Sequence, residues 1–290
     1  MYHLYHFFLN IAYLSKANLP SGWKLKVLFK YLQIGALFLL SLLIGKRVGT
    51  IRAHGYRIRY PSAEVLFSIY GEIFVKQEYS LGLFDEEPYC RDGCVIVDAG
   101  ANIGLATLYF ALFCPAAKIV AIEPDPSTYG FLRANVEGNE LESRVTTYQY
   151  ALTDADDVPL SFFVSETAGD PTMSTIQGRG GKKEVQVKGM RLSTILDKHG
   201  LIGGNNVLKM DVEGAEGKVL NDLTATQSLE KFSNIIIEFH HHVSPDLDFS
   251  RFLSTFSDRF DYHLSAEAIP RSAKYKFQDI VLYFYAKRPT

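Results

Sequence analysis

The stretch VIVDAGANIG, residues 95–104, is an apolar run that ends in an aspartate and then breaks into glycines around one asparagine. Its apolar half is typical of a buried strand. Gly100 permits a strained turn and the close approach of another backbone, and Gly104 permits tight packing of the following helix. The stretch therefore predicts a strand, a ligand-binding turn and a helix in succession.

Six more segments have strand composition, with Val, Ile, Phe and Tyr enriched. They are residues 118–123, 144–150, 206–211, 234–239, 260–265 and 279–286, with helical patterns at 103–113 and 127–137. This spacing fits βαβ crossovers, and the continuously apolar strands are expected to be central and parallel. The predicted fold class is α/β: a doubly wound, mostly parallel seven-stranded sheet with a helical, apolar and basic N-terminal extension.

Four of the predicted strands end in an acid, which matters because doubly wound sheets bind ligands outside the carboxyl ends of their strands. These acids are Asp98, Glu123, Asp211 and Glu238. A dinucleotide fingerprint starting at Gly100 fails, because Asn102 and Leu105 occupy the positions of its second and third glycines. Glu123 is spaced to accept both hydroxyls of a ribose. The pattern predicts a site for a ribosyl ligand without a pyrophosphate.

The chain resembles the class I S-adenosylmethionine-dependent methyltransferases and, among them, the FkbM-type family. The motifs that carry the resemblance are VIVDAGANIG, AIEPDP (121–126), YALTD (150–154) and VLKMDVEGAE (207–216). The resemblance covers roughly residues 60–287 and implies O-methylation of sugar or polyketide hydroxyls, with S-adenosylmethionine as the methyl donor. Carried over, it assigns cofactor binding to Asp98, Gly100, Asn102, Gly104, Glu123, Ala151 and Leu152.

The acceptor side needs a base or a metal, because an unactivated alcohol is a poor nucleophile. Asp211 is the first candidate, followed by Glu213, and Glu216 is suited to the first turn of a helix. Strand alternation places Glu238 and His240 on one side. The predicted catalytic residues are Asp211, Glu213, Glu238 and His240.

A divalent metal held by Asp211, Glu238 and His240 is an alternative for the same site. The preferred interpretation has no metal and uses a histidine as the proton acceptor. If the strand continues, His242 joins the same side.

Residues 159–187 contain a long Gly- and Ser-rich loop, which is predicted to be a lid over the acceptor and the cofactor. Met173 and Ser174 are the residues expected nearest the acceptor, and Tyr79 is expected to close the opposite side. The alternative for both segments is an ordinary surface excursion.

Residues 1–60 differ in charge from the rest of the chain. They carry nine Lys or Arg and no acid, whereas the other 230 residues carry 21 positive and 32 negative side chains, a balance of −11. Residues 31–45 are uncharged, and at ~1.5 Å per residue their helix would be roughly 22 Å long, short of the ~30 Å hydrocarbon core of a bilayer. We expect a helix lying on an anionic membrane surface or, alternatively, one packed on the domain. The predicted domains are 1–60, this extension, and 61–290, the methyltransferase domain.

Composition limits the class of protein. Hydrophobic content of 47% and charged content of 21% indicate a globular chain. Cys90, Cys94 and Cys114 are odd in number and lack the partners of a zinc site, which favours reduced structural thiols and a cytoplasmic location, with peripheral membrane attachment as a further expectation. No nucleic-acid partner is expected, because the excess of positive charge is confined to an apolar segment.

The function expected is O-methylation of a hydroxyl on a sugar, glycolipid, polysaccharide or related metabolite. A nicotinamide-dependent oxidoreductase on the same fold is the enzymatic alternative. A cofactor-binding module without catalysis, docked at a membrane, is the third.

Overall fold

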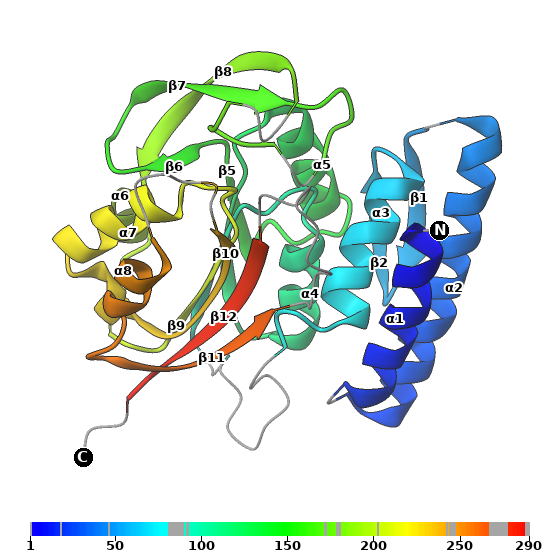
Figure 1. Cartoon of the computed structure of the whole chain (residues 1–290), viewed down its shortest axis with the longest axis horizontal. Coiled ribbons are helices and arrows are strands. Elements are labelled where there is room, and N and C mark those ends of the chain that lie inside the picture. The colour runs from blue at the N-terminus through cyan, green and yellow to red at the C-terminus, as the bar shows by residue number, and fades with distance from the viewer. Residues whose placement is uncertain are drawn as a thin grey trace.

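The centre of the molecule is one seven-stranded sheet with helices on both faces (Figure 1). The computed structural model describes residues 2–17, 19–45, 47–80, 90, 93–170, 173–177, 181–201, 203–241, 243, 248–266 and 278–287. Along the sheet the strands are β11 (Phe260–Ala266), β12 (Gln278–Ala286), β10 (Phe232–His241), β9 (Asn206–Met210), β3 (Val95–Ala99), β4 (Lys118–Ile122) and β5 (Val145–Tyr148). All seven predicted strands are present, and the doubly wound α/β fold is confirmed.

Five of the strands, from β10 to β5, pair in parallel. The expectation that every continuously apolar strand runs parallel is wrong for β12, which is antiparallel to both β10 and β11. The reason lies in the chain order: β11 and β12 follow one another and pair directly, and antiparallel neighbours need no crossover helix.

Successive residues of β3 belong to different halves of the core, which is why the strand reads as a continuous apolar run. Ile96 belongs to the buried cluster that includes Leu108 of α4 (Leu105–Phe113) and Leu132 of α5 (Pro126–Glu137). Val97 belongs to the other cluster, with side chains of α6 (Leu192–Lys198), α7 (Glu216–Ala225), the short helix η2 (Ser228–Lys231) and α8 (Phe249–Ser254). Both faces of the sheet are therefore covered.

A smaller three-stranded sheet follows β5 in the chain (Figure 1). Its strands are β6 (Ala151–Thr153), β8 (Lys183–Arg191) and β7 (Val158–Val164), in that order across the sheet. β7 and β8 are antiparallel, and the predicted lid lies between them in the chain. Ser174 in the intervening loop pairs with Phe163 of β7, so the loop folds back onto the small sheet.

The N-terminal part contains two helices and a hairpin, followed by a short helical segment. These are α1 (Tyr2–Lys16), α2 (Ser21–Ile44), β1 (Gly49–Ala53), β2 (Tyr56–Tyr60), α3 (Ala63–Tyr70) and the π-helical turn η1 (Gly71–Val75). The length expected from residues 31–45 is wrong, because the helix begins after Pro20 and has 24 residues, about 36 Å at ~1.5 Å per residue. By length and composition α2 is able to cross a bilayer.

One face of α2 packs on the protein through aromatic rings. Tyr31 stacks on Phe7 of α1 and on Phe67 of α3, with ring centroids 5.4 and 5.0 Å apart, and Phe38 stacks on Phe67 at 5.2 Å. The opposite face exposes Leu25, Phe29, Leu32, Leu39, Leu40, Leu42, Leu43 and Ile44. The alternative of a helix packed on the domain therefore describes one face of α2. The other face exposes a stripe of apolar side chains. The predicted boundary at residue 60 stays a prediction, since buried residues on both sides of it share one cluster.

The cysteines differ from the expectation of reduced thiols. Cys90 and Cys114 form a disulfide that joins the segment before β3 to the end of α4, while Cys94 is buried and takes no part in it. The two paired cysteines lie 24 residues apart in the chain, so no local spacing indicates their pairing. Disulfides are rare in reducing compartments, and the cytoplasmic location stays a prediction.

Candidate active site

A pocket that opens to solvent lies at the carboxyl ends of the central strands, and its empty space, with the open solvent at its mouth included, is about 620 Å³. It adjoins β3 and β9, the point from which the strand order proceeds in opposite directions, where such sheets bind ligands. Five predicted cofactor residues line it: Gly100, Asn102, Glu123, Ala151 and Leu152. Asp211, Glu213 and Met173, predicted for the acceptor side, line the same cavity.

The loops after β3 and β9 touch at the cavity wall, and this contact requires a glycine. Gly100 has a φ of 77°, and a Cβ there would lie 1.7 Å from the carbonyl oxygen of Asp211. The amide of Asp211 donates to the carbonyl of Ala99 over 3.0 Å. The close backbone approach predicted for Gly100 is thus an approach to the strand that carries Asp211.

Glu123 follows β4 and is almost fully buried in the cavity wall. Its carboxylate accepts hydrogen bonds from the backbone amides of Asn102 and Asp125 over 3.0 and 2.9 Å, one on each oxygen. Each oxygen keeps a lone pair for a further donor, as the two hydroxyls of a ribose require. Burial raises the pKa of Glu123 to about 8, although the two backbone hydrogen bonds act in the opposite direction.

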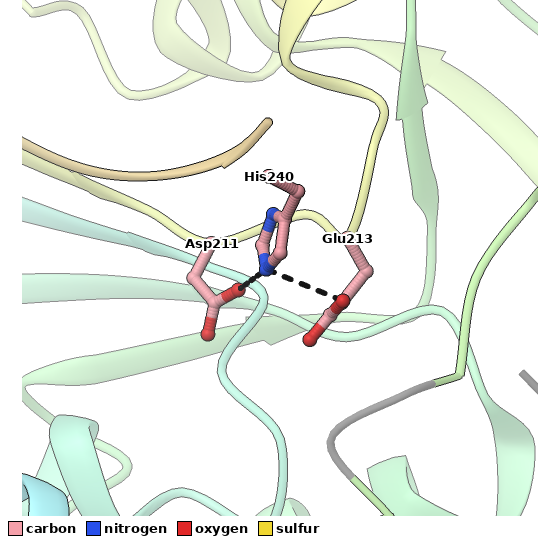
Figure 2. A group of neighbouring side chains, drawn as sticks. All are labelled: Asp211, Glu213 and His240. Carbon is pink, nitrogen blue, oxygen red and sulfur yellow. Dashed lines mark ion pairs between the residues drawn. The ribbon is translucent and has the colours of Figure 1, made fainter. Parts of the chain in front are cut away.

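A second group of charged side chains surrounds the imidazole of His240 (Figure 2). Nε2 lies 3.3 Å from Oε2 of Glu213, 3.7 Å from Oδ1 of Asp211 and 3.9 Å from Oε1 of Glu238. On the other side of the ring, Nδ1 lies 2.6 Å from Oε1 of Glu216. Burial alone would lower the pKa of His240, but the carboxylates of Glu213 and Glu216 outweigh it and the pKa is raised well above its usual value.

The family model described as the FkbM methyltransferase domain matches residues 98–277, more than half of the chain. The chain belongs to the FkbM methyltransferase family. Methyltransferase sdnD of Sordaria araneosa is 33% identical in an alignment of 196 residues that covers 59% of this chain and 73% of that protein. The hexuronic acid methyltransferase AglP of Haloferax volcanii is 30% identical in an alignment of 167 residues that covers 55% of this chain and 61% of that protein. A solved FkbM methyltransferase from Methylobacillus flagellatus KT has a TM-score of 0.42 at 17% identity, with 77% of this chain and 54% of that one covered.

Lys209 is a site residue of this FkbM methyltransferase that sequence reasoning missed. Its ammonium donates to the carbonyl of Gly100 over 2.7 Å and lies 3.3 Å from Asp98 and 3.7 Å from Asp211. Burial alone would lower the pKa of Lys209, but the carboxylates of Asp98 and Asp211 prevail and the pKa is raised. The available signal was a charged residue inside a strand whose other positions are buried.

Glu216 has a larger role than that of a first-turn acid. Its side chain is 1% exposed, and Oε1 accepts from the backbone amide of Gly214 over 3.0 Å as well as facing Nδ1 of His240. In the same loop Glu213 has a φ of 52°, and its carbonyl accepts a hydrogen bond from the hydroxyl of Ser174. The DVEGAE loop, residues 211–216, is therefore held in a conformation that orients both Glu213 and His240.

Asp98 and Gly104 are not among the residues that line the cavity, and their place beside the cofactor stays a prediction. Asp98 is fully buried, and its carboxylate accepts from the hydroxyl of Thr107 over 2.6 Å and pairs with Lys209. Gly104, with a φ of 90°, lets the start of α4 approach Leu132 of α5, where a Cβ would lie 2.9 Å from a methyl group. Both residues support the loop that carries Gly100 and Asn102.

The predicted lid residues Met173 and Ser174 lie beside the cavity, and hydrogen bonds hold their loop in place. Met173 lines the cavity, and Ser174 is fully buried against the DVEGAE loop. The amide of Gly169 donates to Thr128, and its carbonyl accepts from the side chain of Asn102 over 3.3 Å. The loop therefore contacts both the turn after β3, at Asn102, and the turn after β9, at Glu213.

Tyr79 is buried, with its ring 5.4 Å from the ammonium of Lys209, and its role in closing the site opposite the lid stays a prediction. Burial, and then the charges of Asp211 and Glu238, raise the pKa of Tyr79 well above its usual value. Burial and the charge of Asp211 likewise raise the pKa of Glu238, so this acid favours its protonated form. His242, expected on the same side, lies outside the described residues.

Proposed function

We propose that this FkbM methyltransferase transfers a methyl group from S-adenosylmethionine to a hydroxyl of a sugar, glycolipid, polysaccharide or related hydroxylated metabolite. One observation supports this most: a single cavity is lined by Glu123, a carboxylate suited to a ribose, and by Asp211 and Glu213, which face His240. A sugar acceptor is supported by the similarity to AglP, whose name specifies hexuronic acid.

The described residues fit the chemistry of S-adenosylmethionine. Glu123 offers two acceptor oxygens for a diol, and Ile122, Leu152 and Phe162 give the same cavity an apolar wall for a flat base. Gly100 and Asn102 line the side nearest Asp211. When bound, the cofactor supplies an electrophilic methyl group on a sulfonium.

The remaining work falls to the protein. Transfer is an in-line displacement, so the acceptor oxygen must be aligned with the methyl carbon and water excluded. As the new C–O bond forms and the C–S bond breaks, the hydroxyl proton must leave. We assign Asp211 to receive it, because Asp211 lines the cavity while the charged Lys209 and the ring of His240 fix its position.

The two alternative functions are less well supported. Membership of a methyltransferase family opposes a nicotinamide-dependent oxidoreductase. A cofactor-binding module without catalysis does not account for the charged groups gathered around His240.

The test is the release of S-adenosylhomocysteine in the presence of candidate acceptors. We expect hexuronic acids and other sugars to support release, whereas the same sugars with all hydroxyls blocked should support none. A protein that binds S-adenosylmethionine and releases no product with any hydroxylated acceptor would favour the module without catalysis. Reduction of a nicotinamide cofactor by the same acceptors would overturn the proposal.

We also propose that the exposed stripe of α2 rests on an anionic membrane surface. The exposed stripe is apolar. Lys24, Lys26 and Lys30 lie in the first half of helix α2. Each Lys or Arg near an anionic leaflet contributes about 1 kcal/mol, and the apolar stripe adds burial. Crossing the bilayer would separate Tyr31 and Phe38 from the aromatic rings on which they stack, so the interface is the better position.

Vesicle sedimentation measures this directly. Full-length protein should bind vesicles that contain anionic lipid, and binding should weaken as added salt shortens the Debye length below ~10 Å. Leu39→Glu with Leu43→Glu should reduce the partition coefficient about tenfold or more. Leu264→Glu changes an exposed leucine of β11 in the same way and should bind like the wild type. Equal binding by both variants, or none by the wild type, would contradict the proposal.

A further inference from the structure

We infer that Asp211, Glu213 and His240 form a binding site for one divalent metal ion. The inference rests on the proposed function only for the use of the ion, because the site is argued from its own geometry. The candidate ligand atoms are a carboxylate oxygen from each acid and a ring nitrogen, and all lie within 4.8 Å of one another. Figure 2 shows the three side chains converging on one point.

The distances from Nε2 of His240 to the carboxylate oxygens suit a shared metal ion better than a hydrogen bond. A charge-assisted N–H···O bond is about 2.7–2.9 Å long, and the Nδ1 side of the ring makes such a contact with Glu216 at 2.6 Å. On the Nε2 side the oxygens stand off at 3.3 Å for Glu213 and 3.7 Å for Asp211. Donor atoms that share one metal at about 2.0–2.2 Å lie roughly 3.0–3.5 Å apart. The Glu213 distance is within this range, and Asp211 needs only a small movement toward the ion.

Two atoms in this set are buried without a hydrogen bond to any described residue: Nε2 of His240 and Oδ1 of Asp211. The side chain of His240 is 1% exposed, and its nitrogen points between the carboxylates. A buried polar atom without a partner is costly, so its place in the fold calls for a ligand. A bound ion would satisfy both atoms at once.

The other side of the ring is arranged as in metal-binding histidines. Such histidines usually donate their second ring N–H to a carboxylate, which fixes the tautomer and the ring orientation. Glu216 is in this position, and its side chain is itself held by the amide of Gly214. An ion that displaces the proton of Nε2 leaves the proton of Nδ1 on the Glu216 side, and the lone pair of Nε2 then faces the site.

The negative charge around His240 also favours a bound cation. The carboxylates of Asp211, Glu213 and Glu216 lie within 3.7 Å of the ring nitrogens. The cation beside them, Lys209, is shared with Asp98. A divalent ion would offset the excess negative charge, and the two partly exposed acids, at 23% and 16%, can rotate to close on it.

Two carboxylates with one imidazole fit Mg²⁺ or Mn²⁺, which prefer oxygen ligands, and leave positions open for an acceptor hydroxyl. A hydroxyl bound there would have a lower pKa and lose its proton more readily to Asp211 or to solvent. The ligand set differs from the one expected from sequence, with Glu213 in the place of Glu238.

The experiment is Mn²⁺ titration of chelator-treated, full-length protein, followed by electron paramagnetic resonance. We expect one bound Mn²⁺ per chain, competed by Mg²⁺, with a ¹⁴N coupling that reports an imidazole ligand. His240→Gln should remove the coupling and weaken binding at least tenfold, as should Glu213→Gln without a change in the melting temperature. His199→Gln and Glu137→Gln, which change the same residue types away from the site, should bind like the wild type.

The inference is overturned if the wild type binds no Mn²⁺ near stoichiometry, or if bound Mn²⁺ shows no nitrogen coupling. Because the wild-type coupling needs no variant, a His240→Gln protein that fails to fold does not weaken the test. S-adenosylmethionine binding and methyl transfer are measured on the same chelated protein. Transfer that persists at the full rate after chelation overturns the use of the ion in methyl transfer and leaves the methyltransferase proposal standing. Mn²⁺ binding without transfer to any acceptor supports the metal site and contradicts the proposed function.

Discussion

Asp211→Asn is expected to lower kcat by about 10²- to 10⁴-fold, the range found when a positioned proton acceptor is removed. The Kd for S-adenosylmethionine should change by less than about threefold, because the groups assigned to the ribose and the base lie elsewhere in the cavity. The substitution keeps the shape of the side chain and the backbone contact between Asp211 and Gly100. It removes the charge that faces His240 and Lys209.

Initial rates at saturating cofactor and calorimetric titration separate the two quantities. Asp197→Asn is the matched control, since Asp197 is an exposed acid whose ion pair with Lys231 lies away from the cavity. An Asp211→Asn protein with a large loss of cofactor affinity and an unchanged kcat would make Asp211 a cofactor ligand. A wild-type rate in this variant would remove it from the chemistry.

The sheet could be predicted because its strands are buried on both faces and therefore carry a strong local pattern. The acids that follow strands also identified one edge of the sheet, and Glu123 and Asp211 do line the same cavity. Direction was harder to predict, as β12 shows. A continuous apolar run indicates burial but does not distinguish a parallel from an antiparallel neighbour.

The parts of the site that sequence reasoning missed depend on contacts between distant residues. Lys209 reaches Gly100, 109 residues away, and Glu216 reaches His240. No local pattern encodes either contact. The same holds for Cys90 and Cys114, which the fold joins, and for α2, whose exposed stripe is defined only by what packs on its other face.

Glu123→Gln is expected to weaken S-adenosylmethionine binding by about 2 to 4 kcal/mol, the loss of two charge-assisted hydrogen bonds. This corresponds to roughly thirtyfold to a thousandfold in Kd. The side-chain amide of the glutamine also places an NH₂ group opposite one of the two backbone N–H groups that donate to Glu123 in the wild type. Glu137→Gln is the matched control, because it changes an exposed glutamate at the end of α5.

The pH dependence makes this prediction specific to the ionised carboxylate. Burial raises the pKa of Glu123 to about 8 in the free protein, so the carboxyl is largely protonated at neutral pH. Ribose hydroxyls donate hydrogen bonds and therefore select the ionised form, so binding must release a proton below that pH. Affinity should then rise as pH increases toward about 8 and level off above it. Titration calorimetry in buffers of different ionisation enthalpy measures the released proton, and Glu123→Gln should release correspondingly less, with the amino group of the ligand titrating alike in both proteins. Equal proton release by the two proteins, together with equal affinity, would remove Glu123 from the ribose site.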